Sequence, residues 1–169
     1  LGADVIKVET PEVGDDARHF GPFLNGDKDK SAYFISINCG KKSVTLNLKD
    51  STGTEVFSDL VRHADVLVEN YRPGTLTRLG FPREKLSEIN PSLVYASASG
   101  FGHSGSDSEM AAYDMIIQAR SGLMSITGEA GPPPVKVGVP ITDLGAGLFA
   151  VTGILSALLA RARTGRGQR

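Results

Sequence analysis

The chain has 169 residues, 40% of them hydrophobic and 22% charged, so it is long enough to bury a core and has the composition of a globular protein. The formal net charge of −1 gives no support for nucleic acid or an anionic membrane surface as a partner. The one cysteine, Cys39, excludes an internal disulfide and suggests a reducing compartment.

The first third of the chain alternates strand and helix patterns. Short apolar or alternating runs predict strands, a Gly/Pro/Asp-rich stretch predicts a long loop, and an Asp-Ser-Thr start predicts a helix. We expect strands at 4–9 and 43–48, a loop at 11–30, a helix or strand at 31–38 and a helix at 50–63.

The rest of the chain continues this alternation. Two further apolar strands alternate with helices and with glycine-rich loops. We expect strands at 65–69 and 93–99, a turn at 71–74 leading into 75–79, helices at 82–88 and 110–123, loops at 100–107 and 128–134, and a long apolar helix over 143–160.

This order predicts an α/β fold with a Rossmann-like, largely parallel sheet and flanking helices. The uncharged segment 144–160 is at the short limit for spanning a bilayer, so it is interpreted as a core helix. The first residues read as the end of a helix before a strand, with no initiator Met, and the last residues read as a turn. We therefore expect a fragment of a longer polypeptide.

A glycine loop follows the strand at 93–99. Residues 100–105 match the G-x-G-x-x-G pattern of dinucleotide-binding loops. Ser106 to Ser108 prolong the loop, and no strand with a terminal acid follows, so this pattern favours a loop that lines another ligand.

Basic residues follow predicted strands at Lys49, Arg72 and Arg78. Ligands of open α/β sheets gather beyond the carboxyl ends of strands, and arginine pairs with phosphate in a bidentate manner. These residues are candidates for binding phosphate. An ordinary role as solvated surface residues is equally consistent with their spacing.

Asp143 is the lone acid before the long apolar helix. It has three interpretations: a helix N-cap, a metal ligand or a carboxylate nucleophile. From composition alone the N-cap is favoured, because Asp is common at that position. No metal site is predicted, because no His or acid lies nearby in the sequence. None of the three histidines pairs with a Ser or Cys in a recognisable catalytic motif, and Cys39 is interpreted as structural.

Nine motifs occur in order along the chain. They are L-G-A-D-V-I-K-V-E, a G-D-D loop, N-C-G-K-K-S-V-T-L-N-L-K, A-D-V-L-V-E-N-Y-R-P-G, L-T-R-L-G-F, I-N-P-S-L-V-Y-A-S-A-S-G-F-G, Y-D-M-I-I-Q-A-R-S-G-L-M-S-I-T-G, T-D-L-G-A-G and T-G-R-G-Q. Together they resemble the class III (family III) CoA-transferases, whose superfamily also contains the α-methylacyl-CoA racemases.

The resemblance implies the large domain of an interlocked homodimer. Residues 1–169 would form a partial CoA-binding catalytic domain that lacks an opening strand–helix unit and the C-terminal half of the parent chain. That missing half would carry a second glycine loop that closes over the catalytic acid, so the isolated fragment is expected to be inactive.

The resemblance also implies the chemistry. The family's catalytic carboxylate matches Asp143, which would attack a thioester and pass CoA from an acyl-CoA donor to a small carboxylic acid through covalent aspartyl intermediates. CoA and acyl-CoA would be substrates, with no permanently bound cofactor, metal, nucleic acid or membrane. The family's CoA contacts match Leu46, Asn47, Leu48, Lys49, Asn70, Tyr71, Arg72, Arg78, Ala111, Ala112, Tyr113 and Asp114.

Two alternatives remain. A racemase would carry a histidine base where this chain has Tyr113, and tyrosine is a poor base at neutral pH. A non-catalytic CoA-binding fragment would not depend on Asp143. The compartment would be the cytoplasm in a bacterium and the mitochondrion or peroxisome in a eukaryote.

Overall fold

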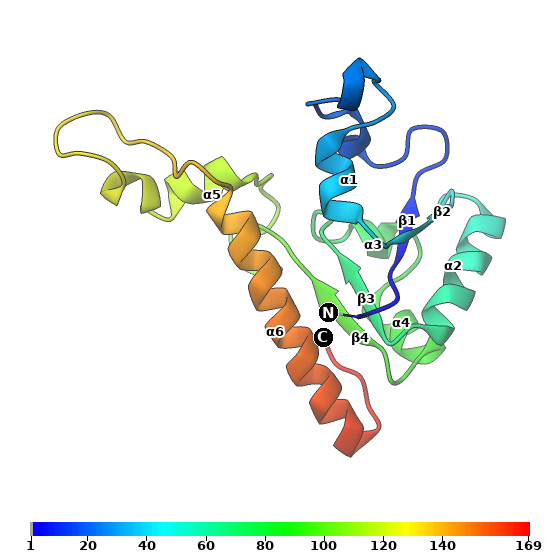
Figure 1. Ribbon diagram of the computed structural model, residues 1–169. Coiled ribbons are helices and arrows are strands. Elements are labelled where there is room, and N and C mark those ends of the chain that lie inside the picture. The colour runs from blue at the N-terminus through cyan, green and yellow to red at the C-terminus, as the bar shows by residue number, and fades with distance from the viewer. Residues whose placement is uncertain (1) are drawn as a thin grey trace. The chain divides into compact units, whose positions relative to one another are not determined.

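The computed structural model describes residues 2–169, so Leu1, the first residue of the opening motif, lies outside the described residues (Figure 1). The chain divides into two compact units, Leu1–Asp59 and Leu60–Arg169. The prediction of one partial domain stays a prediction.

The first unit is built on a parallel strand pair. Strand β1 pairs with β2 in a register that runs from Ile6 opposite Lys42 to Glu9 opposite Thr45. A crossover of short helices connects the two strands, as parallel pairing requires. The elements are β1 (Ile6–Glu9), η1 (Asp16–His19), η2 (Leu24–Gly26), α1 (Ala32–Asn38), β2 (Lys42–Thr45) and α2 (Ser51–His63), which continues into the second unit.

A buried carboxylate anchors the loop after β1. Glu9 is 5% exposed and accepts two hydrogen bonds of 2.8 Å from the guanidinium of Arg18. It also accepts from the Ser43 hydroxyl at 2.6 Å and from the Asp15 backbone N–H at 2.8 Å. The Arg18 hydrogen bonds in particular lower the pKa of Glu9 to about 2, against the desolvating effect of burial.

The second unit is built on another parallel pair. Strands β3 and β4 pair from Val66 opposite Val94 to Glu69 opposite Ser97. Figure 1 shows the long helix α6 running beside β4, and α5 packs against α6. The elements are β3 (Val66–Glu69), α3 (Thr75–Arg78), α4 (Arg83–Ile89), β4 (Val94–Ser97), α5 (Asp114–Arg120), η3 (Leu123–Ile126) and α6 (Ile141–Thr164).

The core of the second unit lies under α4 and around Asn90. The largest fully buried side chains of the described residues are Phe81, Leu86, Gln118 and Val61, of which Gln118 lies on α5. The buried Asn90 amide donates to the backbone oxygens of Val61 at 3.0 Å and Ala64 at 2.9 Å. These bonds satisfy carbonyls at the end of α2 that have no partner within the helix.

The last residues of the chain run alongside β4 and form a backbone hydrogen bond with it. The backbone N–H of Tyr95 donates to the oxygen of Gln168 at 2.9 Å, and that of Gly167 donates to Pro91 at 2.9 Å. A Cβ on Gly167 would lie 1.9 Å from the backbone oxygen of Leu93. Only glycine therefore fits this close backbone approach.

The α/β class and the parallel strand pairing predicted from the sequence are confirmed. Several bounds differ. Residues 31–38, left open between helix and strand, contain α1, and β2 ends at Thr45 because its partner β1 ends at Glu9. The predicted helix over 110–123 is wrong at its start, because α5 begins at Asp114.

Helix α6 also differs from its prediction. It begins at Ile141, with Pro140 as its N-cap residue, so the interpretation of Asp143 as the N-cap is wrong. Ala157 is its buried residue, whereas Leu148 and Phe149 are 71% and 81% exposed. We predicted a buried core helix here, but within the described residues much of the apolar surface of α6 is exposed. Within residues 2–169, α6 is the one helix long and apolar enough to cross a membrane by length and composition, a test that core helices also pass.

Candidate active site

Asp143 lies in the first turn of α6, with its side chain exposed. Pro140 precedes the helix and provides no side-chain cap. The N-terminus of a long helix favours an ionised carboxylate there. Within residues 2–169 the Asp143 carboxylate is therefore accessible from solvent.

Asp114 connects α5 to this turn. Its Oδ1 accepts a 2.9 Å hydrogen bond from the backbone N–H of Thr142 and a 2.7 Å bond from the Thr142 hydroxyl. Its Oδ2 accepts a 2.6 Å bond from Nε2 of Gln118, which is completely buried. The structure thus brings the Asp114 end of the predicted CoA-contact run beside the residue that precedes Asp143.

The pKa values of Asp143 and Asp114 shift in opposite directions. Desolvation, followed by the negative charge of Asp114, raises the pKa of Asp143 above its ordinary value. Desolvation also acts to raise the pKa of Asp114. Hydrogen bonds from Thr142, Gln118 and the Asp143 backbone outweigh it and lower that pKa. Asp114 is therefore the more acidic partner, and Asp143 is the more basic carboxylate.

The run before α5 is held by a glycine of the G-x-G-x-x-G loop. A Cβ on Gly100 would lie 2.0 Å from the Cβ of Ala112, so the loop touches Ala112 directly. Tyr113, which is 81% exposed, is the N-cap residue of α5. The glycine loop thus supports the segment Ala111 to Asp114.

The remaining candidates of the second unit follow β3. The backbone N–H of Tyr71 donates to Oε2 of Glu69 at 2.6 Å, and Asn70, Tyr71 and Arg72 are exposed. Arg78 is also exposed and donates to the Thr75 hydroxyl at 2.8 Å. Their positions beyond the carboxyl end of a parallel strand suit a phosphate-bearing ligand.

The candidates of the first unit follow β2. The backbone N–H of Leu46 donates to the oxygen of Glu9, and the Asn47 side chain accepts from the N–H of Lys49 at 3.1 Å. Leu48 lies between them. A Cβ on Gly53 would lie 2.1 Å from the Asn47 oxygen, so the start of α2 approaches this turn closely. The CoA contacts in both units stay predictions.

One polar cluster was missed by the sequence reasoning. The hydroxyls of Tyr95, at 2.9 Å, and of Ser97 donate to Oε1 of Glu69, and the Ser97 oxygen lies 2.9 Å from Nε2 of His103. Burial and then Glu69 raise the pKa of Tyr95. The acid contacts the serine rather than the histidine, so the cluster lacks the order of a catalytic triad.

The pairing of β3 with β4 could have revealed this cluster. Glu69 ends one predicted strand, Ser97 lies near the end of the next, and adjacent parallel strands bring such ends together. Ser97 and His103 are only six residues apart, but the end of a strand followed by a glycine loop does not predict that their side chains meet.

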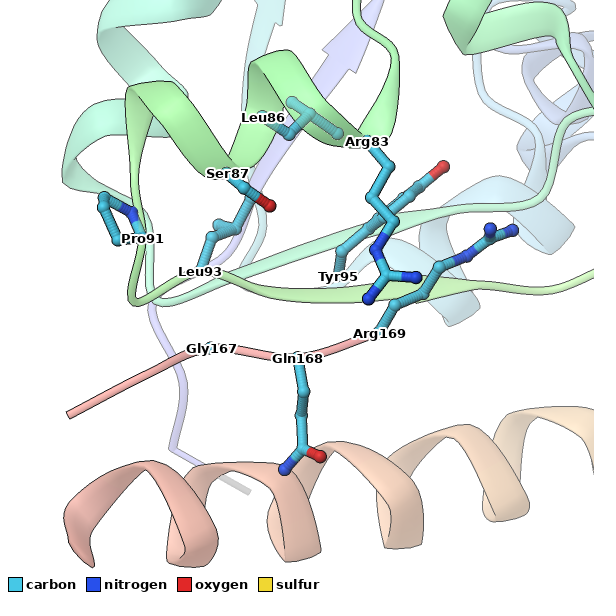
Figure 2. Close-up of a pocket in the computed structure, with 9 residues that line it drawn as sticks. All are labelled: Arg83, Leu86, Ser87, Pro91, Leu93, Tyr95, Gly167, Gln168 and Arg169. Carbon is cyan, nitrogen blue, oxygen red and sulfur yellow. The ribbon is translucent and has the colours of Figure 1, made fainter. Parts of the chain in front are cut away.

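Two hollows lie in the second unit, away from Asp143. One of about 380 Å³ lies between β4 and α6 and includes Ser97. The other, of about 50 Å³, carries two arginines near Tyr95 (Figure 2). Its lining is Arg83, Leu86, Ser87, Pro91, Leu93, Tyr95, Gly167, Gln168 and Arg169. Residues 2–169 contain no cluster of three or more His, Cys, Asp or Glu suited to a metal.

The chain matches CoA-transferase family III over residues 1–169. An acetyl-CoA:oxalate CoA-transferase from Acetobacter aceti is 51% identical over 99% of this chain and 42% of that enzyme. A succinyl-CoA:glutarate CoA-transferase from Mus musculus is 48% identical over 99% of this chain and 38% of its own length. The crystal structure of a CAIB/BAIF family protein from Brucella suis matches with a TM-score of 0.92 and 47% identity, over 99% of this chain and 45% of that one.

These matches agree with the α/β fold described above. The chain belongs to CoA-transferase family III. It spans 38% to 45% of the length of the relatives compared.

Proposed function

We propose that the whole protein transfers CoA from an acyl-CoA to a small carboxylic acid, with Asp143 as the nucleophile. The observation that carries the proposal is the exposed, comparatively basic carboxylate of Asp143 beside the predicted CoA-contact run. Relatives named for oxalate and glutarate make a dicarboxylate the first acceptor to test. A homodimer is proposed with it.

The first half of the proposed cycle moves CoA onto the enzyme. A carboxylate oxygen of Asp143 attacks the thioester carbon of the donor, the C–S bond breaks, and CoA leaves as the thiolate with the bonding electron pair. The resulting anhydride joins Asp143 to the donor acyl group. The thiolate then attacks the Asp143 carbonyl carbon, which releases the donor as a carboxylate and leaves an aspartyl-CoA thioester.

The second half runs in the opposite direction. The acceptor carboxylate attacks the aspartyl thioester, so a second anhydride forms and the thiolate is freed. The thiolate attacks the acceptor carbonyl, and Asp143 leaves as a carboxylate. Each attack develops an oxyanion, which backbone N–H groups stabilise in enzymes of acyl transfer.

Steady-state kinetics test this function. We expect the whole protein to convert acetyl-, formyl- or succinyl-CoA plus oxalate or glutarate to the exchanged thioester. The Asp143→Asn variant should lose about 1,000-fold or more in kcat, since it removes the nucleophile. Glu84→Gln is the matched control, because Glu84 is an exposed first-turn acid of α4.

Other results would replace the proposal. Full activity of the Asn variant would overturn the role of Asp143. Deuterium uptake at the α-carbon of a branched acyl-CoA, without CoA exchange, would indicate the racemase. CoA binding with neither reaction would indicate a non-catalytic CoA-binding protein.

A further inference from the structure

The carboxyl of Asp114 makes its hydrogen bonds within the chain. It was expected to contact CoA, yet both of its oxygens accept hydrogen bonds within the chain. Two of these bonds come from Thr142, the neighbour of Asp143, and the third comes from Gln118. The side chain is thus already fixed between two helices.

The start of α6 explains why an acceptor is needed there. The first N–H groups of a helix have no partner within the helix, and Pro140 supplies no side-chain acceptor. Asp114 supplies that acceptor from α5, through the 2.9 Å bond from the Thr142 N–H. The carboxyl therefore determines where the backbone of Thr142, and with it Asp143, lies.

Gln118 prevents Asp114 from turning away. Its buried amide donates to Asp114 at 2.6 Å and accepts from the backbone N–H of Val137 at 2.8 Å. This second bond ties the loop that leads into α6 to the same amide. A completely buried side chain with both ends bonded holds one orientation.

Charge gives Asp114 a second effect on Asp143. Two nearby carboxylates repel each other, and the repulsion disappears when one becomes neutral. Protonation makes Asp143 neutral and removes this repulsion, so the charge of Asp114 contributes to the raised pKa of Asp143. Forming an anhydride or a thioester neutralises it too, so the same repulsion favours acylation.

We propose that Asp114 is a positioning residue, which fixes the Asp143 carboxyl through Thr142 and promotes its acylation through like-charge repulsion. The inference rests on the proposed function of Asp143. It assigns Asp114 to the nucleophile rather than to CoA.

The test compares Asp114→Asn with Thr142→Val in the whole protein. The first variant removes the charge, and the second removes one hydroxyl bond while it keeps both the charge and the backbone bond. Three measurements are made: the pKa of Asp143, by carboxyl ¹³C NMR assigned with Asp143→Asn; the rate of covalent labelling by acyl-CoA; and the steady-state kcat and KM for acyl-CoA.

For Asp114→Asn we expect a lower Asp143 pKa and labelling about 10-fold slower, as for the loss of one charged hydrogen bond, with KM for acyl-CoA within about twofold. Thr142→Val should slow labelling and leave the pKa in place. Asp114→Glu should restore the pKa of the wild-type protein. If Asp114→Asn does not fold, the Thr142→Val and Asp114→Glu results decide.

An unchanged Asp143 pKa and labelling rate in Asp114→Asn would overturn the proposal. A raised KM at constant kcat would also overturn it and return Asp114 to the CoA contacts. The NMR measurement needs no turnover. Absence of labelling in the wild-type protein would therefore refute the proposed function itself, whereas an unchanged pKa beside an active wild type refutes only the role of Asp114.

Discussion

At the scale of single residues, one carboxylate in each unit illustrates how its surroundings set its role. Glu9 is held ionised by Arg18, Ser43 and a backbone N–H, so it supports structure. Asp143 has a raised pKa and an exposed side chain, so its carboxylate is suited to chemistry. Local hydrogen bonds, rather than residue type, separate these roles.

The Glu9 anchor predicts a pH-dependent stability. Its pKa falls from 4.5 to about 2 on folding, so the bound carboxylate stabilises the unit above pH 4.5. That contribution, about 3 kcal/mol, is lost as the pH falls from 4.5 toward 2. Glu9→Gln should therefore lower the free energy of opening of the loop after β1 at pH 7, with a difference that shrinks across this window.

Native-state hydrogen exchange of this loop, corrected for intrinsic rates, measures the effect. Asp4→Asn is the matched control, because Asp4 pairs with Lys42 while 71% of its side chain is exposed. Such exposed pairs contribute about 0 to 1 kcal/mol. Equal effects of the two variants would contradict the anchoring role of Glu9.

At the scale of elements, close backbone contacts decide the edge of β4. Gly167→Ala should break the pairing of residues 167–169 with β4 and cost about 2 kcal/mol or more, because its Cβ would lie 1.9 Å from the Leu93 oxygen. Thermal unfolding measures the change. Gly138→Ala is the control, since its Cβ would meet no described atom within 4 Å. An unchanged melting temperature for Gly167→Ala would contradict the contact.

Elements with strong local patterns were predictable from the sequence. The strands within 4–9 and 65–69 and the helix at 50–63 depend on apolar periodicity and a start signal carried by adjacent residues. Elements fixed by distant partners were not. The segment before α5 is non-helical where Gly100 contacts Ala112, and β2 stops where β1 provides no further partner.

The same distinction applies to the site. Sequence context alone favoured Asp143 as an N-cap, which is wrong, and its catalytic role, implied by the family resemblance, stays a prediction. The Asp114–Thr142 bonds and the Glu69–Ser97 contact depend on which helices and strands lie side by side. No local spacing rule carries that information.

At the scale of the whole molecule, the apolar surface of α6 has the largest consequence. Leu148, Phe149, Leu155 and Leu159 are more than half exposed. Contiguous exposed apolar surface of this kind drives association. We predict that residues 1–169 expressed alone self-associate and do not transfer CoA.

Sedimentation of this chain tests that prediction. The double variant Leu148→Gln with Phe149→Gln should weaken self-association about tenfold or more, because it removes the two most exposed large apolar side chains of α6. Thr152→Gln, at an exposed position of the same helix, is the control. A monomeric wild-type chain would contradict the prediction.

The proposed function requires that Asp143 becomes covalently modified during CoA transfer. The most direct measurement incubates the whole protein with acetyl-, formyl- or succinyl-CoA, traps with hydroxylamine, and maps the modified residue by peptide mass spectrometry. We expect a hydroxamate on Asp143 that requires acyl-CoA and is absent from Asp143→Asn. Transfer that proceeds while Asp143 stays unmodified, or trapping at another residue, would contradict it.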